Sequence, residues 1–309
     1  MRILIAGTGG VGGFFGGLLA RAGEEVVFLA RGANLAALRE RGLRIESVDG
    51  DVHVPRVAAT DRLAGAPPVA LAIVTVKSYD TAAVAAAIAP VVGPETIVLS
   101  LQNGTENESL LAAALGLPPL LGAMTQIGAE LIAPGIVRHV AEGTIFFGEF
   151  SGRPSARTRR LVELFTAAGI RHRCASDILL MLWDKLEWNA AFNAVTALTR
   201  TTSGEAARLP ATAAVVRAAM HEVVAVAQAQ GIALDPARVE PTIAYSAEYL
   251  GTLRTSMLQD LERGHRLEYD AINGAVVRCG DAVGVPTPVN RTLVGLLAAI
   301  DPARARDST

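Results

Sequence analysis

Residues 3–12 read Ile-Leu-Ile-Ala-Gly-Thr-Gly-Gly-Val-Gly, an apolar run followed by glycines in the spacing G-x-G-x-x-G. The run predicts a strand, and residues 12–22 predict a helix that ends at Gly23. Gly7 would allow the tight turn, Gly9 the close approach of backbone to a pyrophosphate, and Gly12 close packing of helix on sheet. A glycine-rich turn can also have a purely structural role. Here a predicted strand precedes the turn and a predicted helix follows it, which favours a phosphate site at the helix N-terminus. The predicted dinucleotide-binding residues are Gly7, Thr8, Gly9, Gly10, Val11 and Gly12.

Short β-branched runs alternate with helical patterns through the first half of the chain, which is typical of βαβ units and a parallel sheet. We expect strands at 3–6, 25–30, 69–76, 96–101 and 170–174, the last closing the sheet, and helices at 81–92 and 154–168. We also expect a hairpin within 43–57 and a second one in which 136–140 and 144–150 flank Glu142-Gly143.

From Asp177 onward the strand-like alternation disappears, and long helical patterns cover residues 178–198, 211–230 and 267–283. The sequence therefore predicts an α/β fold with two domains. Residues 1–176 would form a Rossmann-type, mainly parallel sheet that binds NADP, and residues 177–309 an all-α domain that carries substrate and catalysis. The alanine-rich helices of the second domain could pair in a homodimer.

Composition excludes several classes of protein. A formal net charge of −2 gives no reason to expect a nucleic-acid partner. Cys174 and Cys279 are far apart, and the five histidines are scattered, so neither a disulfide framework nor a metal site is expected. The apolar runs are too short or too interrupted to span a bilayer, and no targeting segment is evident. We therefore expect a cytoplasmic protein with no membrane partner.

The end of the second predicted strand indicates which dinucleotide is bound. Sites that prefer NAD usually place an acidic residue there for the ribose 2′-hydroxyl. This chain has Phe28-Leu29-Ala30-Arg31 and no acid. Arg31 could be an ordinary surface arginine, but a guanidinium can also bind a 2′-phosphate with two hydrogen bonds. Its position favours NADP.

The predicted helix at 178–198 carries a polar stripe. Lys185, Asn189 and Asn193 are spaced i, i+4, i+8 and so share one face, and asparagine is a poor helix former. A solvated face explains the spacing equally well. The alternative is a general acid with two orienting amides, in which the ammonium protonates a carbonyl oxygen as hydride reaches the carbon.

Six stretches of this chain resemble ketopantoate reductases (2-dehydropantoate 2-reductases), in order and in approximate spacing, from residue 1 to about Pro288. They are Gly7–Gly12, Thr75-Val76-Lys77, Gln102-Asn103-Gly104, Leu182–Asn193, Ser256-Met257-Leu258-Gln259-Asp260 and Glu268–Gly274. Each stretch alone is weak evidence. Together they are highly specific, and they imply NADPH-dependent reduction of 2-dehydropantoate to (R)-pantoate in pantothenate biosynthesis.

On the substrate side, the resemblance implies that Lys185 is the proton donor and that Asn189 and Asn193 hold the substrate and position the lysine. Ser256 matches the stretch that meets the substrate carboxylate, and Glu268 matches the carboxylate that binds the hydroxyl end and neighbours the cofactor. Taken alone, Ser256 could be a helix N-cap and Glu268 a favourable first-turn acid.

On the cofactor side, the resemblance implies that Lys77 and Asn103 contact the nicotinamide side of NADPH. Gly128 falls near another cofactor contact. Alone, Lys77 could be a solvated lysine at a strand end, and Asn103-Gly104 an ordinary turn.

Two positions depart from the family pattern. Leu253 stands where many members have an asparagine, and Ser203-Gly204 replaces an Asn-Gly after the catalytic helix. Each change removes an amide from the expected substrate pocket, in which Ser203 remains a candidate contact. Two alternatives therefore stay open: a related reductase of another small 2-oxo acid, and a non-catalytic NADPH-binding sensor. The lysine–asparagine stripe argues against the sensor, which needs no proton donor.

Overall fold

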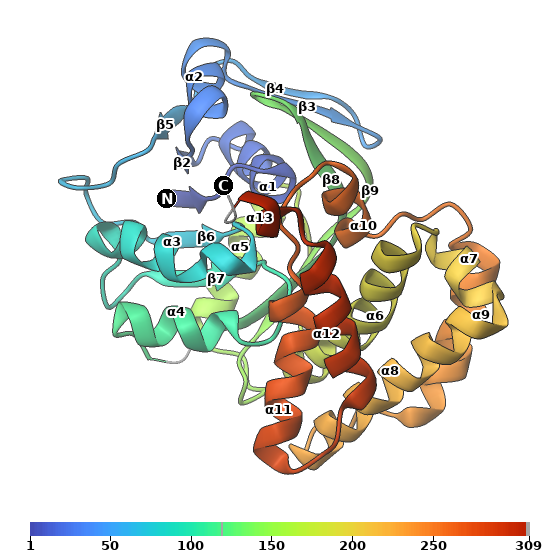
Figure 1. Cartoon of the computed structure of the whole chain (residues 1–309). Coiled ribbons are helices and arrows are strands. Elements are labelled where there is room, and N and C mark those ends of the chain that lie inside the picture. Colours follow the sequence, from blue (N-terminus) through green and yellow to red (C-terminus); the bar gives the residue numbers. More distant parts are fainter. Residues whose placement is uncertain (119, 307–309) are drawn as a thin grey trace. The chain divides into compact units, whose positions relative to one another are not determined.

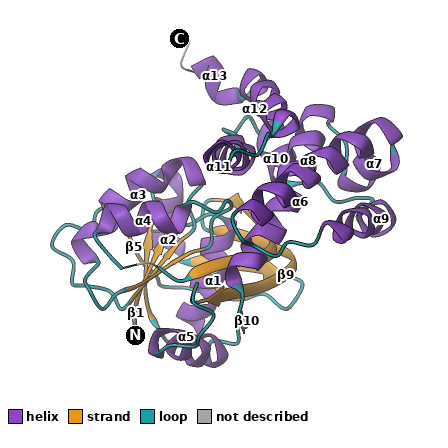
Figure 2. Ribbon diagram, turned by 90° about the horizontal axis from the view of Figure 1, so that it is seen from below, coloured by secondary structure: helices purple, strands orange, loops and turns teal. Residues whose placement is uncertain are grey.

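The computed structural model describes residues 1–118 and 120–306 and divides into two compact units. The N-terminal unit comprises Met1–Gln102 and Asn107–Ile178. The C-terminal unit comprises Asn103–Glu106 and the chain from Leu179 onward. The four residues 103–106, in the loop between the strand at Ile97–Ser100 and the helix that begins at Asn107, therefore belong with the helical unit. Figure 2 shows strands in the N-terminal unit and only helices and loops in the C-terminal one.

A five-stranded parallel sheet forms the centre of the N-terminal unit. Its strands are β5 (Ala58–Thr60), β2 (Glu25–Leu29), β1 (Arg2–Ala6), β6 (Leu71–Val74) and β7 (Ile97–Ser100), in that order across the sheet. Every residue of β6 and β7 is buried, as the apolar runs predicted. The chain passes from β1 to β2 on one side and later to β6 on the other. Ligands of doubly wound sheets bind beyond the carboxyl ends of the strands at such a reversal.

Helices cover both faces of this sheet. They are α1 (Gly10–Arg21), α2 (Gly32–Arg41), α3 (Thr81–Ile88), α4 (Asn107–Leu115) and α5 (Ala156–Ala167), with short 3₁₀ turns at Ser78–Asp80 and Ala89–Val91. Figure 1 shows α3 and α4 beside β6 and β7. The sequence reading missed α2 and α4. In α2 only Leu35, Ala37 and Leu38 are buried, so its apolar pattern is too short to stand out.

A second sheet packs against α1. It contains β3 (Leu43–Ser47), β4 (Val52–Val54), β8 (Gly122–Ala133), β9 (Ile136–Gly148) and β10 (Arg171–Cys174). The strand order is β10-β9-β3-β4, and β8 pairs antiparallel with β9. The expected hairpin within 43–57 is confirmed as β3–β4. The prediction that 170–174 closes the first sheet was wrong, because β10 pairs with β9.

The predicted hairpin at Glu142-Gly143 was also wrong. Residues on both sides of it form one strand, β9, whose partner β8 precedes it in the chain. Gln126 pairs with Thr144 and Ile127 with Glu142, which leaves Gly143 as an extra residue. The positive φ angles of Glu142 (61°) and Gly143 (105°) therefore mark a β-bulge. A bulge and a tight turn need the same backbone conformations, so the dipeptide alone does not distinguish them.

The described part of the C-terminal unit contains helices but no strand. They are α6 (Ile178–Thr199), α7 (Ser203–Arg208), α8 (Pro210–Ala229), α9 (Val239–Tyr249), α10 (Ser256–Glu262), α11 (Ala275–Val283), α12 (Pro288–Ile300) and α13 (Pro302–Arg306), with a 3₁₀ turn at Pro236–Arg238 and a π-helix at Asp270–Gly274. The predicted α/β fold class, with a Rossmann-type sheet followed by helices, is confirmed. α8 is long and apolar enough to cross a membrane by length and composition, but its buried residues belong to the core of this unit.

Candidate functional site

The glycine turn between β1 and α1 has the geometry of a phosphate loop. Gly7 adopts a φ of 107°, which side chains other than glycine rarely tolerate. A methyl group at Gly12 would overlap the Gly7 carbonyl and the Thr75 hydroxyl, so only glycine fits under this turn. At Gly9, by contrast, a methyl group would meet no atom within 4 Å. Gly9 is also the N-cap of α1 and supplies no side-chain cap, which suits a helix end that binds an external anion.

Asn34, which the sequence reading did not single out, braces this turn. Its Nδ2 donates to the Thr8 carbonyl at 2.9 Å, and its Oδ1 accepts from the Gly135 backbone at 2.8 Å. The Thr8 hydroxyl donates to the Leu29 carbonyl at the end of β2, at 3.2 Å. The turn is thus tied to α2, to β2 and to the β8–β9 connection. These contacts link residues far apart in the chain, so no local motif reveals them.

The other cofactor candidates lie at strand ends or in the second sheet. Arg31 is exposed and forms the N-cap of α2, directly after β2. Lys77 follows β6 and precedes the 3₁₀ turn at Ser78–Asp80. Gly128 lies in β8 beside a register shift, where an added methyl group would press on Val140. Lys77 and Arg31 therefore both follow the carboxyl end of a strand of the parallel sheet, where the fold places ligands.

In the C-terminal unit, α6 carries the polar stripe that the spacing predicted. Lys185 is half-buried, and Asn189 and Asn193 are buried, with Asn193 only 1% exposed. The alternative of a solvated face is therefore wrong for the two asparagines. Among the residues that the structure describes, no group hydrogen-bonds Nδ2 of Asn193. A buried amide without a partner is costly, and a ligand that accepts a hydrogen bond from it would remove that cost.

The Lys185 ammonium has the electrostatics of a proton donor. Burial lowers its pKa from 10.5 to about 8, and the carboxylate of Glu268 opposes that fall. Glu268 is itself buried and lies just before the helical segment that continues into α11. At neutral pH the lysine is thus protonated but far more acidic than a free lysine.

Two further candidate substrate contacts lie in this unit, at the N-termini of α7 and α10. Ser203, the first residue of α7, is fully buried, and its hydroxyl has no partner among the described residues. The Ser203 amide donates to the Leu253 carbonyl at 2.9 Å, so the two positions that depart from the family pattern are joined. Ser256 is the first residue of α10. The alternative that Ser256 is an N-cap was wrong, because Thr255 caps that helix.

Asn103 lies in the four-residue loop that belongs to the C-terminal unit. In the same loop, Glu106 accepts two hydrogen bonds from the Arg278 guanidinium, at 2.7 and 3.3 Å. Arg278 also donates to the Asp270 carboxylate at 2.9 Å. The ion pairs thus fasten the Asn103 loop to the helical segment that follows Glu268.

The scarcity of lysine in this chain is a separate argument for functional roles of Lys77 and Lys185. Of the 28 lysine and arginine residues, only Lys77 and Lys185 are lysine. Arginine holds its proton at every accessible pH and cannot serve as a proton donor, whereas a buried lysine can. Both lysines of the chain therefore stand at positions singled out as candidate site residues.

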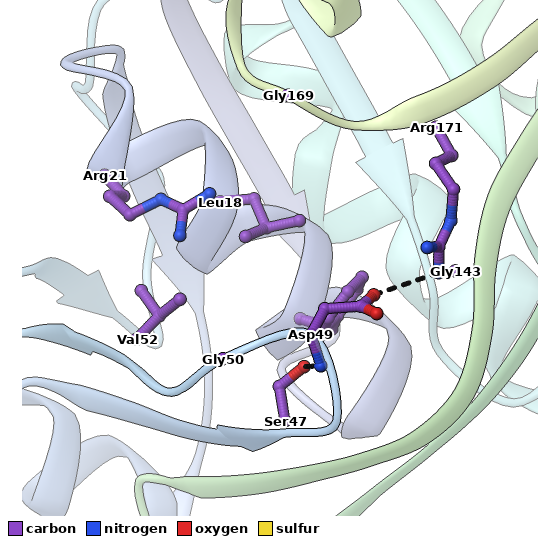
Figure 3. A pocket seen from close by; sticks show the side chains of 10 residues that line it. Leu18, Arg21, Ser47, Asp49, Gly50, Val52, Gly143, Gly169 and Arg171 are labelled. Atoms are coloured by element: carbon purple, nitrogen blue, oxygen red, sulfur yellow. Dashed lines mark hydrogen bonds and ion pairs between the residues drawn. The ribbon is translucent and has the colours of Figure 1, made fainter.

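A cavity of about 230 Å³ lies elsewhere in the N-terminal unit. It is lined by one face of α1 and by the β3–β4 hairpin, with Gly143, Gly169 and Arg171 opposite. Arg171 and Asp49, which both line this cavity, form an ion pair at 3.0 Å. Figure 3 shows the two side chains and marks this pair. Because none of the predicted site residues lines this cavity, it is separate from the candidate site. Across residues 1–118 and 120–306, no cluster of three or more histidine, cysteine, aspartate or glutamate residues could hold a metal ion.

Comparisons with known proteins agree with this arrangement. The family model described as "Ketopantoate reductase PanE/ApbA" matches residues 3–152, and its C-terminal companion matches residues 177–301. The chain belongs to the ketopantoate reductase family. This is a family of NADPH-dependent oxidoreductases.

Relatives of ketopantoate reductase type cover almost the whole chain. A 2-dehydropantoate 2-reductase of Archaeoglobus fulgidus is 38% identical over 300 residues, which is 97% of this chain and 98% of that protein. The crystal structure of a family member from Ralstonia eutropha JMP134 is 37% identical, with a TM-score of 0.89, and covers 97% of this chain and 98% of its own. A structure of D-mandelate dehydrogenase with NADH is 25% identical with a TM-score of 0.85, over 97% and 98% of the two chains.

Proposed function

We propose that this chain reduces 2-dehydropantoate to (R)-pantoate with NADPH. Family membership and near full-length identity to 2-dehydropantoate 2-reductases support the reaction. The observation that carries the chemistry is the half-buried Lys185, whose pKa falls to about 8 while the buried Glu268 acts on it. A cation of that acidity is suited to protonate an oxygen that becomes an alkoxide.

NADPH fits the residues of the N-terminal unit. The open space at Gly9 and the uncapped start of α1 suit the pyrophosphate, and Arg31 suits the 2′-phosphate. Lys77 and Gly128 of this unit, together with Asn103 of the C-terminal unit, remain the proposed contacts to the rest of the cofactor. When bound, NADPH supplies hydride to the C2 carbonyl carbon of the substrate.

The C-terminal unit would hold the substrate and deliver the proton. Nζ of Lys185 donates to the C2 carbonyl oxygen, and Asn189 and Asn193 hold that oxygen and the lysine in place. Nδ2 of Asn193 supports this role, because it has no hydrogen-bond partner among the described residues and can donate to a ligand. Ser256 would meet the substrate carboxylate, and Glu268 would accept a hydrogen bond from the far hydroxyl.

A second candidate function is reduction of another small 2-oxo acid. Two observations favour it: the exposed Leu253 and the serine at position 203 lack the amides of other members, and a D-mandelate dehydrogenase shares the fold. The buried Ser203 hydroxyl has no partner among the described residues, so it is available to a polar substrate group. A site built around such groups rejects substrates that lack the matching one.

Three further expectations belong to the same proposal. We propose that residues 1–176 and 177–309 act as the cofactor and substrate domains, that the protein works in the cytoplasm, and that alanine-rich helices of the second domain pair in a homodimer. Only helices and loops occur in the described part of the C-terminal unit, which is compatible with a partner helix. Sedimentation equilibrium would test the dimer, and a purely monomeric protein would exclude it.

The deciding experiment follows NADPH oxidation by absorbance with 2-dehydropantoate and a panel of other 2-oxo acids. Strong preference for 2-dehydropantoate establishes the first function. Preference for another acid establishes the second. Tight NADPH binding without turnover of any acid identifies a sensor and refutes both.

A further inference from the structure

A buried network of amides lies in the segment that begins at Glu268. Nδ2 of Asn273 donates to the Ala190 carbonyl of α6 at 2.7 Å and to Oδ1 of Asn290 at 3.0 Å. Asn273 and Asn290 are both fully buried. Ala190 follows Asn189 directly, so the network reaches the helix that carries the polar stripe.

Glu222 of α8 fixes the orientation of this network. Its carboxylate accepts from the backbone amides of Val289 and Asn290, at 2.7 and 2.9 Å, and so caps the start of α12. Nδ2 of Asn290 donates to the same carboxylate at 2.8 Å and to the Ala219 carbonyl at 3.2 Å. With its amino group held there, Asn290 can turn only its oxygen toward Asn273, which must therefore donate.

The π-helix changes the direction in which Asn273 points relative to the residues that precede the helix. Residues five apart in an α-helix point roughly 140° away from each other, at 100° per residue. In a π-helix the hydrogen bonds join residues five apart, which brings such residues to nearly the same face. The π-helix covers residues 270–274, so it contains Asn273 and begins two residues after Glu268. Glu268 acts electrostatically on Lys185, while Asn273 bonds the Ala190 carbonyl of the same helix.

The amide at position 273 is a poor choice for stability alone. No described residue hydrogen-bonds its Oδ1, and an unsatisfied buried polar atom costs roughly 1–3 kcal/mol. The Ala190 carbonyl already lies within a regular helix and gains only a second donor. An apolar side chain of similar volume would remove this unsatisfied oxygen, but Oδ1 of Asn290 would then lose its donor. The amide at position 273 is therefore explained by the two segments that it joins rather than by a gain in stability.

We propose that Asn273 is a positioning residue for Lys185, because its hydrogen bonds fix the Glu268 segment against the helix that bears the lysine. This inference rests on the proposed function, in which Lys185 donates the proton. Removing the amide lets Glu268 move away from Lys185. The ammonium then loses the charge that opposes the effect of burial.

Two acidic side chains lie on α6, Asp184 and Glu187. Asp184 accepts from the Arg238 guanidinium at 2.6 Å. Burial raises the pKa of Glu187 to about 7, Asp184 raises it further, and Arg238 lowers it. Burial lowers the pKa of Lys185 and Glu268 raises it, so the part of a pKa change that disappears in a Glu268→Gln background reports the position of Glu268.

The test is an NMR titration of the protein labelled with ¹³C at Cε of lysine, without substrate or cofactor. The chain has only two lysines, so two signals are expected, and a Lys77→Arg sample assigns them. We expect Asn273→Leu to lower the pKa of Lys185 by roughly half a unit or more and turnover by about 10-fold. Val276→Ala, a buried apolar change in the same helical segment, should lower the melting temperature and leave that pKa unchanged.

Two results would overturn the inference. One is an unchanged Lys185 titration in Asn273→Leu, which would leave Asn273 a structural role only. The other is a full shift that persists in a Glu268→Gln background, where a residue acting through Glu268 has nothing left to move. If the leucine variant does not fold, Asn273→Ser undergoes the same titration. Because the titration needs no substrate, its outcome is independent of whether Lys185 later proves to be the proton donor.

Discussion

The carboxylate of Glu268 raises the pKa of Lys185, against the burial that brings it down to about 8. The lysine comes from the middle of α6 and the glutamate from the segment before α11, and both belong to the C-terminal unit. Burial makes the ammonium acidic enough to give up its proton, and the nearby carboxylate keeps it protonated at neutral pH.

Replacing Lys185 tests its role as proton donor. We expect Lys185→Ala to lower kcat by roughly 10²- to 10⁴-fold, as the loss of a general acid does. Lys185→Arg should be nearly as slow, because it keeps the positive charge but not a proton that can be released. Steady-state NADPH oxidation and an NADPH affinity measurement check this. Near-normal turnover in either variant, with NADPH binding intact, would remove Lys185 from the assigned role.

The pH dependence of turnover should follow Lys185. A proton donor must be protonated, so activity should fall as pH rises through about 8. Glu268→Gln removes the charge that raises this pKa and should move the decline to lower pH, in addition to weakening substrate binding. Asp281→Asn, which removes an exposed negative charge from α11, is the control and should leave the pH profile of turnover unchanged. A shift to higher pH in Glu268→Gln would contradict the pairing.

The glycine turn offers two substitutions that look alike in sequence but differ in structure. Gly9→Ala should fold normally, because its φ of −82° suits alanine and the added methyl group meets nothing within 4 Å. It should nevertheless weaken NADPH binding by roughly 10-fold or more, because the methyl group occupies the approach of the pyrophosphate. Gly12→Ala should instead destabilise the fold by about 1–3 kcal/mol, because its methyl group overlaps the Gly7 carbonyl. Calorimetric binding and thermal unfolding separate the two effects, and equal affinity in Gly9→Ala would contradict the phosphate site.

Arg31 should determine the preference for NADPH. Arg31→Gln removes a charged partner of the 2′-phosphate and should raise the KM for NADPH by roughly 10- to 100-fold, with little effect on that for NADH. Arg41→Gln, an exposed change at the other end of α2, controls for net charge. Equal increases in the KM for NADPH and for NADH would show that Arg31 does not recognise the 2′-phosphate.

Glu108 should make the stability of the N-terminal unit depend on pH. It is buried in the first turn of α4, and burial raises its pKa from 4.5 to about 7. The folded state then binds more protons than the unfolded state between these values, so this contribution to stability is lost as pH rises from 4.5 through 7. Above pH 7, Glu108→Gln should therefore be more stable than the parent by roughly 1–3 kcal/mol. Urea unfolding at pH 5 and pH 8, with the exposed Glu163→Gln as control, measures this, and equal stability of Glu108→Gln and the parent at pH 8 would refute it.

Local sequence was enough for much of the fold and of the candidate site. The glycine spacing predicted the β1–α1 turn because backbone sterics act within a few residues, and Gly7 and Gly12 show those constraints. The apolar run ending at Val76 predicted a buried strand, and the i, i+4, i+8 spacing placed Lys185 and its two asparagines on one helix. Short-range periodicity sufficed in each case.

Tertiary structure alone decided the rest. The Glu142-Gly143 dipeptide becomes a bulge rather than a hairpin because β8, earlier in the chain, supplies the partner strand. Asn34 and Asn273 act through hydrogen bonds to residues distant in sequence, so their partners could not be predicted from local patterns. The acidity of Lys185 depends on burial and on Glu268, and desolvation and Coulomb forces depend on distance in space rather than along the chain.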